Sequence, residues 1–182
     1  MKSFMYGLKR GFPIFLGYLP VSFTFGFMAV SGGIPVWAAV LISLTNVTSA
    51  GQFAGTNLIF ASAGYLEIAL TTFVINLRYS LMSLSLSQKI RTDVPIWKRL
   101  ILSFCITDET FVMASMEPGQ IGAGFFGGLI TLPFIGWVLG TFLGGTISTL
   151  LPAELQSAMG IGLYAMFIAL IVPAAREKKN VC

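Results

Sequence analysis

Three ionisable residues fall in the middle of otherwise apolar segments of this 182-residue chain. Arg78 lies in the segment 71–87, which reads TTFVINLRYSLMSLSLS, and Asp108 and Glu109 lie in the segment 100–116. An ionised side chain at the centre of a bilayer costs roughly 3 kcal/mol or more. These three groups therefore require charged partners, a water-filled cavity, or both.

Arg78 and the two acids are spaced to meet across a helical hairpin. Arg78 lies about ten residues before the basic loop 89–99, and Asp108 lies about ten residues after it. Antiparallel helices joined by this loop would bring the charges to a similar depth, and removing one of two paired buried charges typically costs about 3–5 kcal/mol. We expect a binding or proton-coupling site; the alternative is a structural ion pair that holds the hairpin together.

The composition is typical of a helical membrane protein. Hydrophobic residues make up 55% of the chain and charged residues 10%, and the mean hydropathy is +0.85. Soluble domains carry about 25% charged residues. The sequence therefore predicts an all-α, polytopic membrane protein with one transport domain over residues 1–182. The net charge of +4 comes from short basic clusters beside the apolar segments and does not indicate nucleic-acid binding.

The absence of histidine restricts the chemistry further. It excludes imidazole proton relays, histidine metal sites and Ser-His catalysis. Two cysteines, Cys105 and Cys182, do not suggest a disulfide framework. We expect no enzymatic activity, no metal and no cofactor. The chain also has no ATP-binding loop, so transport would use an ion or substrate gradient.

Six apolar segments are separated by turns or charged loops. Four of them, at about 12–30, 71–87, 100–116 and 155–174, predict membrane-spanning helices, and two more, 36–60 and 121–151, are interrupted. Small and polar residues from Asn46 to Gln52 interrupt 36–60, which indicates either an unwound segment or a close helix contact. Pro133 interrupts 121–151, whose glycines at 136, 140 and 144 favour close helix packing.

The charges favour a re-entrant path for the two interrupted segments. If all six segments crossed the membrane, the basic loop 89–99 would lie opposite both basic termini, against the positive-inside rule. If 36–60 and 121–151 each enter and leave on one side, this loop and both termini face the cytoplasm. Glu67, Glu117 and Glu154 then face outward.

The re-entrant path would divide the chain into two structural repeats, about 11–88 and 100–175, each with a broken element. Paired broken helices in corresponding positions of two halves are typical of secondary-transporter sites. Full crossing of both segments is the alternative. Within 71–87 a polar stripe recurs every three or four residues and predicts a face directed at the protein interior: Thr72, Asn76, Tyr79 or Ser80, Ser83 and Ser87.

Three short motifs resemble those of the AzlC family of branched-chain amino acid permeases: SAGQF at 49–53, NLRY at 76–79 and TDET at 107–110. The resemblance implies export of branched-chain amino acids by a bacterial inner-membrane protein that works with a small AzlD-type membrane subunit. Family members usually have histidine where Tyr79 stands, so any imidazole role is absent here. They also commonly continue through further apolar sequence.

An amino acid zwitterion needs one site for its ammonium group and another for its carboxylate. Asp108 or Glu109 suits the ammonium group, and Arg78 suits the carboxylate. The candidate substrate-binding residues are Asn46, Ser49, Gly51, Gln52, Asn76 and Arg78. The candidate proton-coupling or ion-pair residues are Asp108, Glu109 and Arg78, because adjacent acids in a low dielectric favour retention of one proton.

These features predict a secondary transporter for leucine, isoleucine or valine in the cytoplasmic membrane, with proton coupling. A small-solute channel would also use half-helices and an arginine. A non-transporting structural subunit of a membrane complex is the other alternative.

Overall fold

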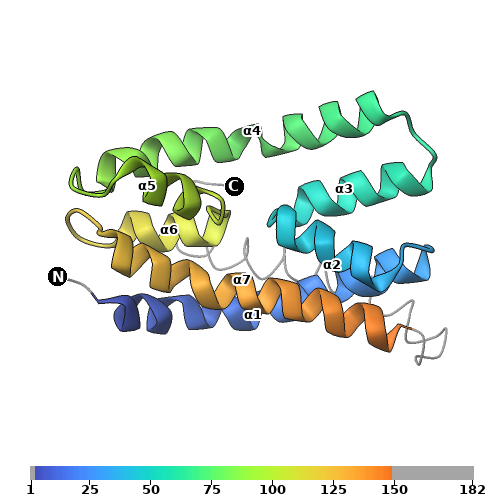
Figure 1. The fold of residues 1–182 in the computed structure, drawn as a ribbon, viewed down its shortest axis with the longest axis horizontal. Coiled ribbons are helices and arrows are strands. Elements are labelled where there is room, and N and C mark those ends of the chain that lie inside the picture. Colours follow the sequence, from blue (N-terminus) through green and yellow to red (C-terminus); the bar gives the residue numbers. More distant parts are fainter. Residues whose placement is uncertain (1–2, 149–182) are drawn as a thin grey trace, which may run out of the picture.

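The protein is described here by a computed structural model covering residues 3–148, which form seven α-helices and no strand (Figure 1). The predicted all-α fold is confirmed. The helices are α1 (Phe4–Ser31), α2 (Val36–Thr45), α3 (Ser49–Phe60), α4 (Tyr65–Lys89), α5 (Ile96–Ser103), α6 (Asp108–Met116) and α7 (Ala123–Ile147). Three of these, α1, α4 and α7, are long and apolar enough to cross a bilayer. The predicted span 155–174 and Glu154 lie outside the described residues.

The helices form three layers (Figure 1). The long helices α1 and α7 lie side by side and run in the same direction. The short helices α2, α3, α5 and α6 form the middle layer, and α4 lies on its far side, packed against α3 and α6.

The segment 36–60 is broken, as the sequence predicts. Helix α2 ends at Thr45, residues 46–48 are non-helical, and α3 returns to the end of the molecule where α2 began (Figure 1). Asn46 and Thr48 are both extended, with φ near −141° and −136°, and the Thr48 hydroxyl donates to Asn46 Oδ1 at 2.6 Å. Such local side-chain bonds compete with helical backbone bonding. The polar residues thus form the tip of a helical hairpin.

The segment 100–116 is not the single span that we expected. Helix α5 stops at Ser103 and α6 starts at Asp108, so this region is a second hairpin, whose tip meets that of the first (Figure 1). Thr107 caps α6 in a reciprocal capping box with Thr110. A cap of this kind starts a new helix. Asp108 and Glu109 occupy its first turn, where negative charge is favourable.

The segment 121–151 is not re-entrant over its described part. Helix α7 continues unbroken from Ala123 to Ile147 through Pro133. Its glycines pack against α1: a methyl group on Gly144 would lie 1.9 Å from the Phe23 carbonyl oxygen. The glycine spacing therefore reflects close helix contact. Pro20, like Pro13, lies inside the continuous helix α1.

Each of two long helices is thus followed by a hairpin. Helix α1 precedes the hairpin α2–α3, and α4 precedes the hairpin α5–α6, which enters from the opposite end of the molecule (Figure 1). This inverted arrangement replaces the predicted pattern, in which the second broken element was 121–151.

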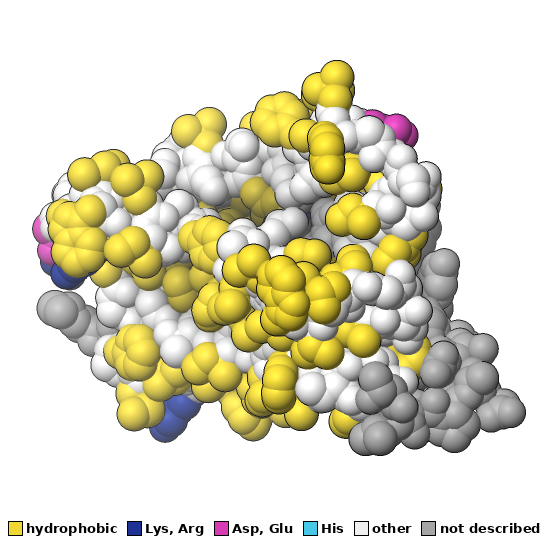
Figure 2. Space-filling model, turned by 45° about the vertical axis from the view of Figure 1, so that its right-hand side comes forward, with side chains coloured by type: hydrophobic (Ala, Val, Ile, Leu, Met, Phe, Trp, Pro, Cys, Tyr) yellow, Lys and Arg dark blue, Asp and Glu magenta, His cyan; other side chains and the backbone are white. Residues whose placement is uncertain are grey.

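Basic side chains gather at one end of the molecule. The N-terminal part of α1, with Arg10, and the 90–95 loop lie at one end, whereas Glu67 starts α4 at the other. Glu117 was expected opposite the basic loop but lies with Arg10, at 3.8 Å from its Nε. Glu117 lies at this end because the second hairpin returns the chain to the end from which it started. Figure 2 shows hydrophobic side chains covering much of the visible face.

The polar stripe of α4 faces inward, as predicted, through Thr72, Asn76, Tyr79 and Ser83, which are half-buried. Ser80 and Ser87 are exposed. The exposed apolar side chains of α4 include Phe73, Val74, Leu77, Leu81 and Leu84. Helix α4 therefore has one polar interior face and one apolar outer face.

Candidate functional site

The two hairpin tips meet beside the middle of α4 and enclose a small cavity. Its volume is about 20 Å³, room for about one water molecule. Six parts of the chain contribute to its lining, which consists of Tyr18, Val47, Ser49, Tyr79, Thr107, Asp108, Glu109 and Trp137. Helix α1, the 46–48 segment, α3, α4, the start of α6 and α7 thus all reach one point.

Arg78 and Asp108 form the ion pair that their spacing predicts. Arg78 Nη2 lies 3.0 Å from Asp108 Oδ2 and also donates to the Tyr79 hydroxyl at 3.0 Å. The guanidinium carbon lies 4.9 Å from the centre of the Tyr79 ring. Both charged side chains are 41% exposed. The pair therefore does not lie in a sealed core and can exchange partners. The charges meet through the start of α6 rather than through a continuous helical hairpin.

Glu109 has a different partner from Asp108. Its Oε2 accepts a hydrogen bond from the Tyr18 hydroxyl at 2.6 Å, and the same hydroxyl lies 2.6 Å from Thr107 Oγ1. Tyr18 is buried and packs edge-on against Trp137, with ring centroids 5.2 Å apart. Asp108 is therefore tied to α4, whereas Glu109 is tied to the α1–α7 pair.

Gln52 is a fully buried link between the first hairpin and α7. Its Oε1 accepts from Trp137 Nε1 at 2.8 Å, and its Nε2 donates to Ser43 Oγ at 2.9 Å. Ser43 Oγ lies 2.7 Å from Thr141 Oγ1. Both ends of the Gln52 amide therefore contact protein in this conformation.

The other predicted binding residues lie around the first hairpin tip. Ser49 lines the cavity, and Asn46 accepts the hydrogen bond from Thr48. A methyl group on Gly51 would lie 2.8 Å from Asn76 Oδ1, so glycine permits this approach of α3 to α4. The Asn76 Oδ1 atom is buried without a hydrogen-bond partner among the described residues. It is an available acceptor at the tip.

Several residues of the site were missed by the sequence reasoning. Tyr18 and Trp137 are aromatic residues inside apolar spans, and buried Tyr and Trp usually have a hydrogen-bond partner. That rule flags them as polar positions but does not name their partners. Thr107 had a clearer signal, because threonine three residues before Thr110 permits the capping box that α6 uses.

The site combines opposite charges with two helix N-termini. The first N–H groups of α3 and α6 have no intrahelical partner, and both helices begin at the hairpin tips. Such ends favour anionic groups. Ligand sites for small organic molecules usually measure about 300–1,000 Å³, so the 20 Å³ cavity is closed in this conformation. Its polar groups suit a small charged ligand.

The fold and site together define a polytopic helical membrane protein with two inverted, interrupted helical hairpins around a charged centre. The AzlC protein family model matches residues 13–151. This chain belongs to the AzlC family.

Three relatives show how far the similarity extends. The Inner membrane protein YgaZ of Escherichia coli strain K12 is 28% identical over 99% of this chain and 76% of its own length. An uncharacterized membrane protein of Archaeoglobus fulgidus is 33% identical over 94% of this chain and 77% of its own. The Branched-chain amino acid transport protein AzlC of Bacillus subtilis is 23% identical over 92% of this chain and 66% of its own. No solved structure matches this chain.

Proposed function

We propose that this chain is the large subunit of a secondary transporter that exports leucine, isoleucine or valine across the cytoplasmic membrane with proton coupling. It is not an enzyme in this proposal, and residues 1–182 act as one transport domain. The name of the Bacillus subtilis relative supports the substrate class. A small AzlD-type membrane subunit would be its partner.

The observation that carries the proposal is the meeting of two broken hairpins at an ion pair. Arg78 and Asp108, 3.0 Å apart, are each half-exposed beside the cavity. A zwitterion can insert between them, because its carboxylate replaces Asp108 at Arg78 and its ammonium group replaces Arg78 at Asp108. Both protein charges then keep a partner, which limits the desolvation cost. Broken helices at a midplane site are typical of such transporters.

The residues around this pair would have separate roles. Asn76 Oδ1, an unpartnered acceptor, suits an ammonium hydrogen. The N-terminus of α3 at Ser49 and Gly51 offers backbone N–H groups to a carboxylate. Asn46 holds the tip in shape, and Gln52 holds the hairpin against Trp137. Asp108, which exchanges Arg78 for the ligand, would carry the coupled proton, and Glu109, bonded to Tyr18, would stabilise the closed site.

The orientation that fits this proposal places both termini and the 89–99 loop in the cytoplasm. In an otherwise cysteine-free protein, Asp93→Cys and Gly119→Cys should resist an impermeant thiol reagent in intact cells. Ser62→Cys, in the turn between α3 and α4, should be labelled. Labelling of Gly119→Cys but not of Asp93→Cys from outside would show that the α5–α6 hairpin crosses the membrane, and labelling of both with Ser62→Cys protected would show the opposite orientation.

The function is tested by counterflow in proteoliposomes containing the full chain, with and without the small partner. Radiolabelled leucine, valine and methionine should accumulate against unlabelled leucine, and the exchange should saturate. A linear, non-saturable flux would instead indicate a small-solute channel. Transport by the partner without this chain would indicate a structural subunit.

A further inference from the structure

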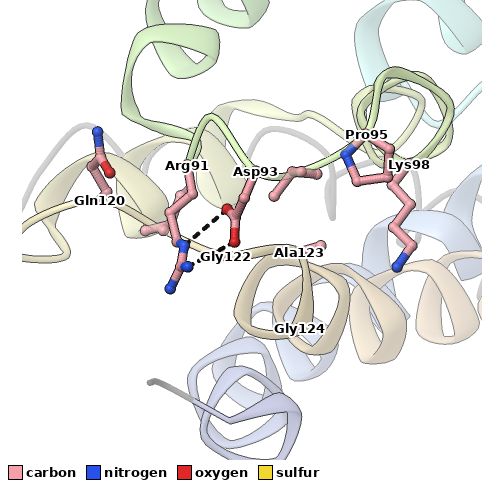
Figure 3. A pocket seen from close by; sticks show the side chains of 10 residues that line it. Arg91, Asp93, Pro95, Lys98, Gln120, Gly122, Ala123 and Gly124 are labelled. Atoms are coloured by element: carbon pink, nitrogen blue, oxygen red, sulfur yellow. Dashed lines mark hydrogen bonds and ion pairs between the residues drawn. The ribbon is translucent and has the colours of Figure 1, made fainter.

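A second pocket lies far from the proposed transport site, at the basic end of the molecule. It measures about 520 Å³ and lies between the 90–95 loop, the start of α5 and the start of α7 (Figure 3). The loop is fixed to the chain before α7 by backbone bonds in both directions, Arg91 N to Ile121 O and Ile121 N to Lys89 O, each at 3.0 Å. The pocket is therefore bounded by well-anchored backbone.

The pocket carries a net positive charge. Arg91 forms a two-point ion pair with Asp93, at 2.7 and 3.0 Å, and the hydrogen bonds from Arg91 hold the pKa of Asp93 below its ordinary value. Asp93 is therefore ionised at neutral pH. Lys98 lies on another side of the pocket (Figure 3) and has no acidic partner among residues 3–148. Two cations and one carboxylate line the pocket, and Arg99, which donates to the Arg91 and Val94 carbonyl oxygens, adds a further positive charge beside the loop.

An apolar groove of about 300 Å³ adjoins this charged pocket and shares Lys98, Ala123 and Gly124 with it. The remaining lining is almost entirely apolar and consists of Phe4, Trp97, Ile101, Leu102 and Gly127. Both α5 and α7 run away from the basic end (Figure 1), so the groove lies about one turn deeper than the charged pocket. The polarity thus changes from cationic at the end to apolar toward the membrane interior.

We propose that the charged pocket and its adjoining groove bind an anionic phospholipid, with the phosphate beside Lys98, which lines both, and one acyl chain along Trp97, Ile101 and Gly127. A negatively charged headgroup compensates the net positive charge of this region, whereas a zwitterionic headgroup leaves it uncompensated. Lys98 Nζ lies 5.2 Å from the Trp97 ring centroid, and paired tryptophan and lysine are usual at the membrane interface. Basic pockets between helices at this depth suit anionic headgroups.

The two halves of the site can be altered separately. Lys98→Gln removes the unpaired charge, and Lys9→Gln is the matched control, an exposed lysine of α1 that lines neither cavity. Gly127→Leu fills the groove without changing charge. Gly17→Leu is its control, because a methyl group on Gly17 meets no atom within 4 Å.

Native mass spectrometry of the purified full chain would compare phosphatidylglycerol with phosphatidylcholine of the same acyl chains. Wild-type protein should retain phosphatidylglycerol preferentially, and Lys98→Gln should weaken that retention by about fivefold, with Lys9→Gln unchanged. Gly127→Leu should lower retention, unlike Gly17→Leu. Excess inorganic phosphate should not displace the lipid, because it cannot occupy the groove.

Three outcomes would overturn the proposal. Equal retention of the two lipids by wild-type protein would show that the site does not select an anionic headgroup. Equal lipid retention by Lys98→Gln and Lys9→Gln would show that the lipid does not bind at this pocket. Displacement by inorganic phosphate, together with no effect of Gly127→Leu, would identify a simple anion site instead.

Discussion

The α1–α7 pair and the hairpin region are built by different means. Along α1 and α7, glycines on both helices bring backbone against backbone: a methyl group on Gly26 would lie 2.1 Å from the Thr141 carbonyl oxygen, and one on Gly7 would lie 2.2 Å from that of Phe125. In the hairpin region, a half-exposed ion pair joins α4 to α6, and a cavity of about 20 Å³ lies beside it. Helix α4 has no buried residue in its apolar window.

This difference indicates a rigid frame, formed by α1 and α7, and a movable part, formed by the hairpin tips and α4. Close backbone packing tolerates little displacement, since interiors at crystal-like density lose contacts with any gap. Hydrogen bonds and ion pairs at a polar tip can exchange one partner for another, including a ligand. We therefore infer that α1 and α7 stay fixed during transport while the hairpin tips and α4 rearrange.

The largest effect should come from disturbing the frame. Gly26→Val places a side chain against the Thr141 backbone, which cannot yield as a flexible side chain can. Overpacking typically costs about 1–3 kcal/mol and sometimes more. We expect loss of monodisperse protein on size-exclusion chromatography after detergent extraction. Gly17→Val, at an open position, should behave as wild type. Equal recovery of both variants would show that α1 and α7 can shift apart at Gly26 without loss of the fold.

The next effect should be on coupling. Asp108→Asn removes the charged partner of Arg78 but keeps a hydrogen-bonding side chain of the same size at the first turn of α6. We expect proton-coupled leucine flux to be abolished while some exchange and the fold remain. The measurement is leucine flux against pH in proteoliposomes. Glu67→Gln, at an exposed acid in the first turn of α4, is the control. An unchanged pH profile in Asp108→Asn would exclude this carboxylate as the group that carries the coupled proton.

A smaller effect should follow from loosening the contact between frame and hairpin. Gln52→Ala deletes two buried hydrogen bonds and leaves the Trp137 N–H without its acceptor. We expect the free energy of unfolding to fall by about 1–3 kcal/mol, measured by thermal unfolding in detergent. Asn57→Ala, at an exposed position of the same helix, is the control. If leucine affinity fell by that amount with stability unchanged, Gln52 would contact substrate, as the sequence reasoning expected.

The smallest effect should come from Tyr18→Phe. This change removes one hydroxyl from Glu109 and Thr107 while keeping the ring against Trp137. We expect a stability loss of about 1 kcal/mol by the same thermal assay, together with altered exchange of leucine. Tyr65→Phe is the control, since Tyr65 is 93% exposed. A larger loss of stability than that of Gln52→Ala would show that the Tyr18 hydroxyl stabilises the α1–α7 pair itself.

The sequence alone determined the features that depend on local spacing. The composition specified a helical membrane protein, and the polar run from Asn46 to Gln52 located the first hairpin tip. The similar distances of Arg78 and Asp108 from the basic loop, about ten residues each, predicted their ion pair, which is present at 3.0 Å. Each of these follows from helical rise and from the cost of isolated charge in a bilayer.

Tertiary structure decided which interruption breaks a helix. Pro133 and the glycines of α7 can mark either a break or a close contact, and only the partner α1 makes them contact sites. The second break is instead at residues 104–107, and that hairpin returns Glu117 to the end that holds Arg10. Gln52 meets Trp137 across 85 positions of sequence. Local periodicity describes one helix at a time, whereas these outcomes depend on surfaces that exist only after the helices pack.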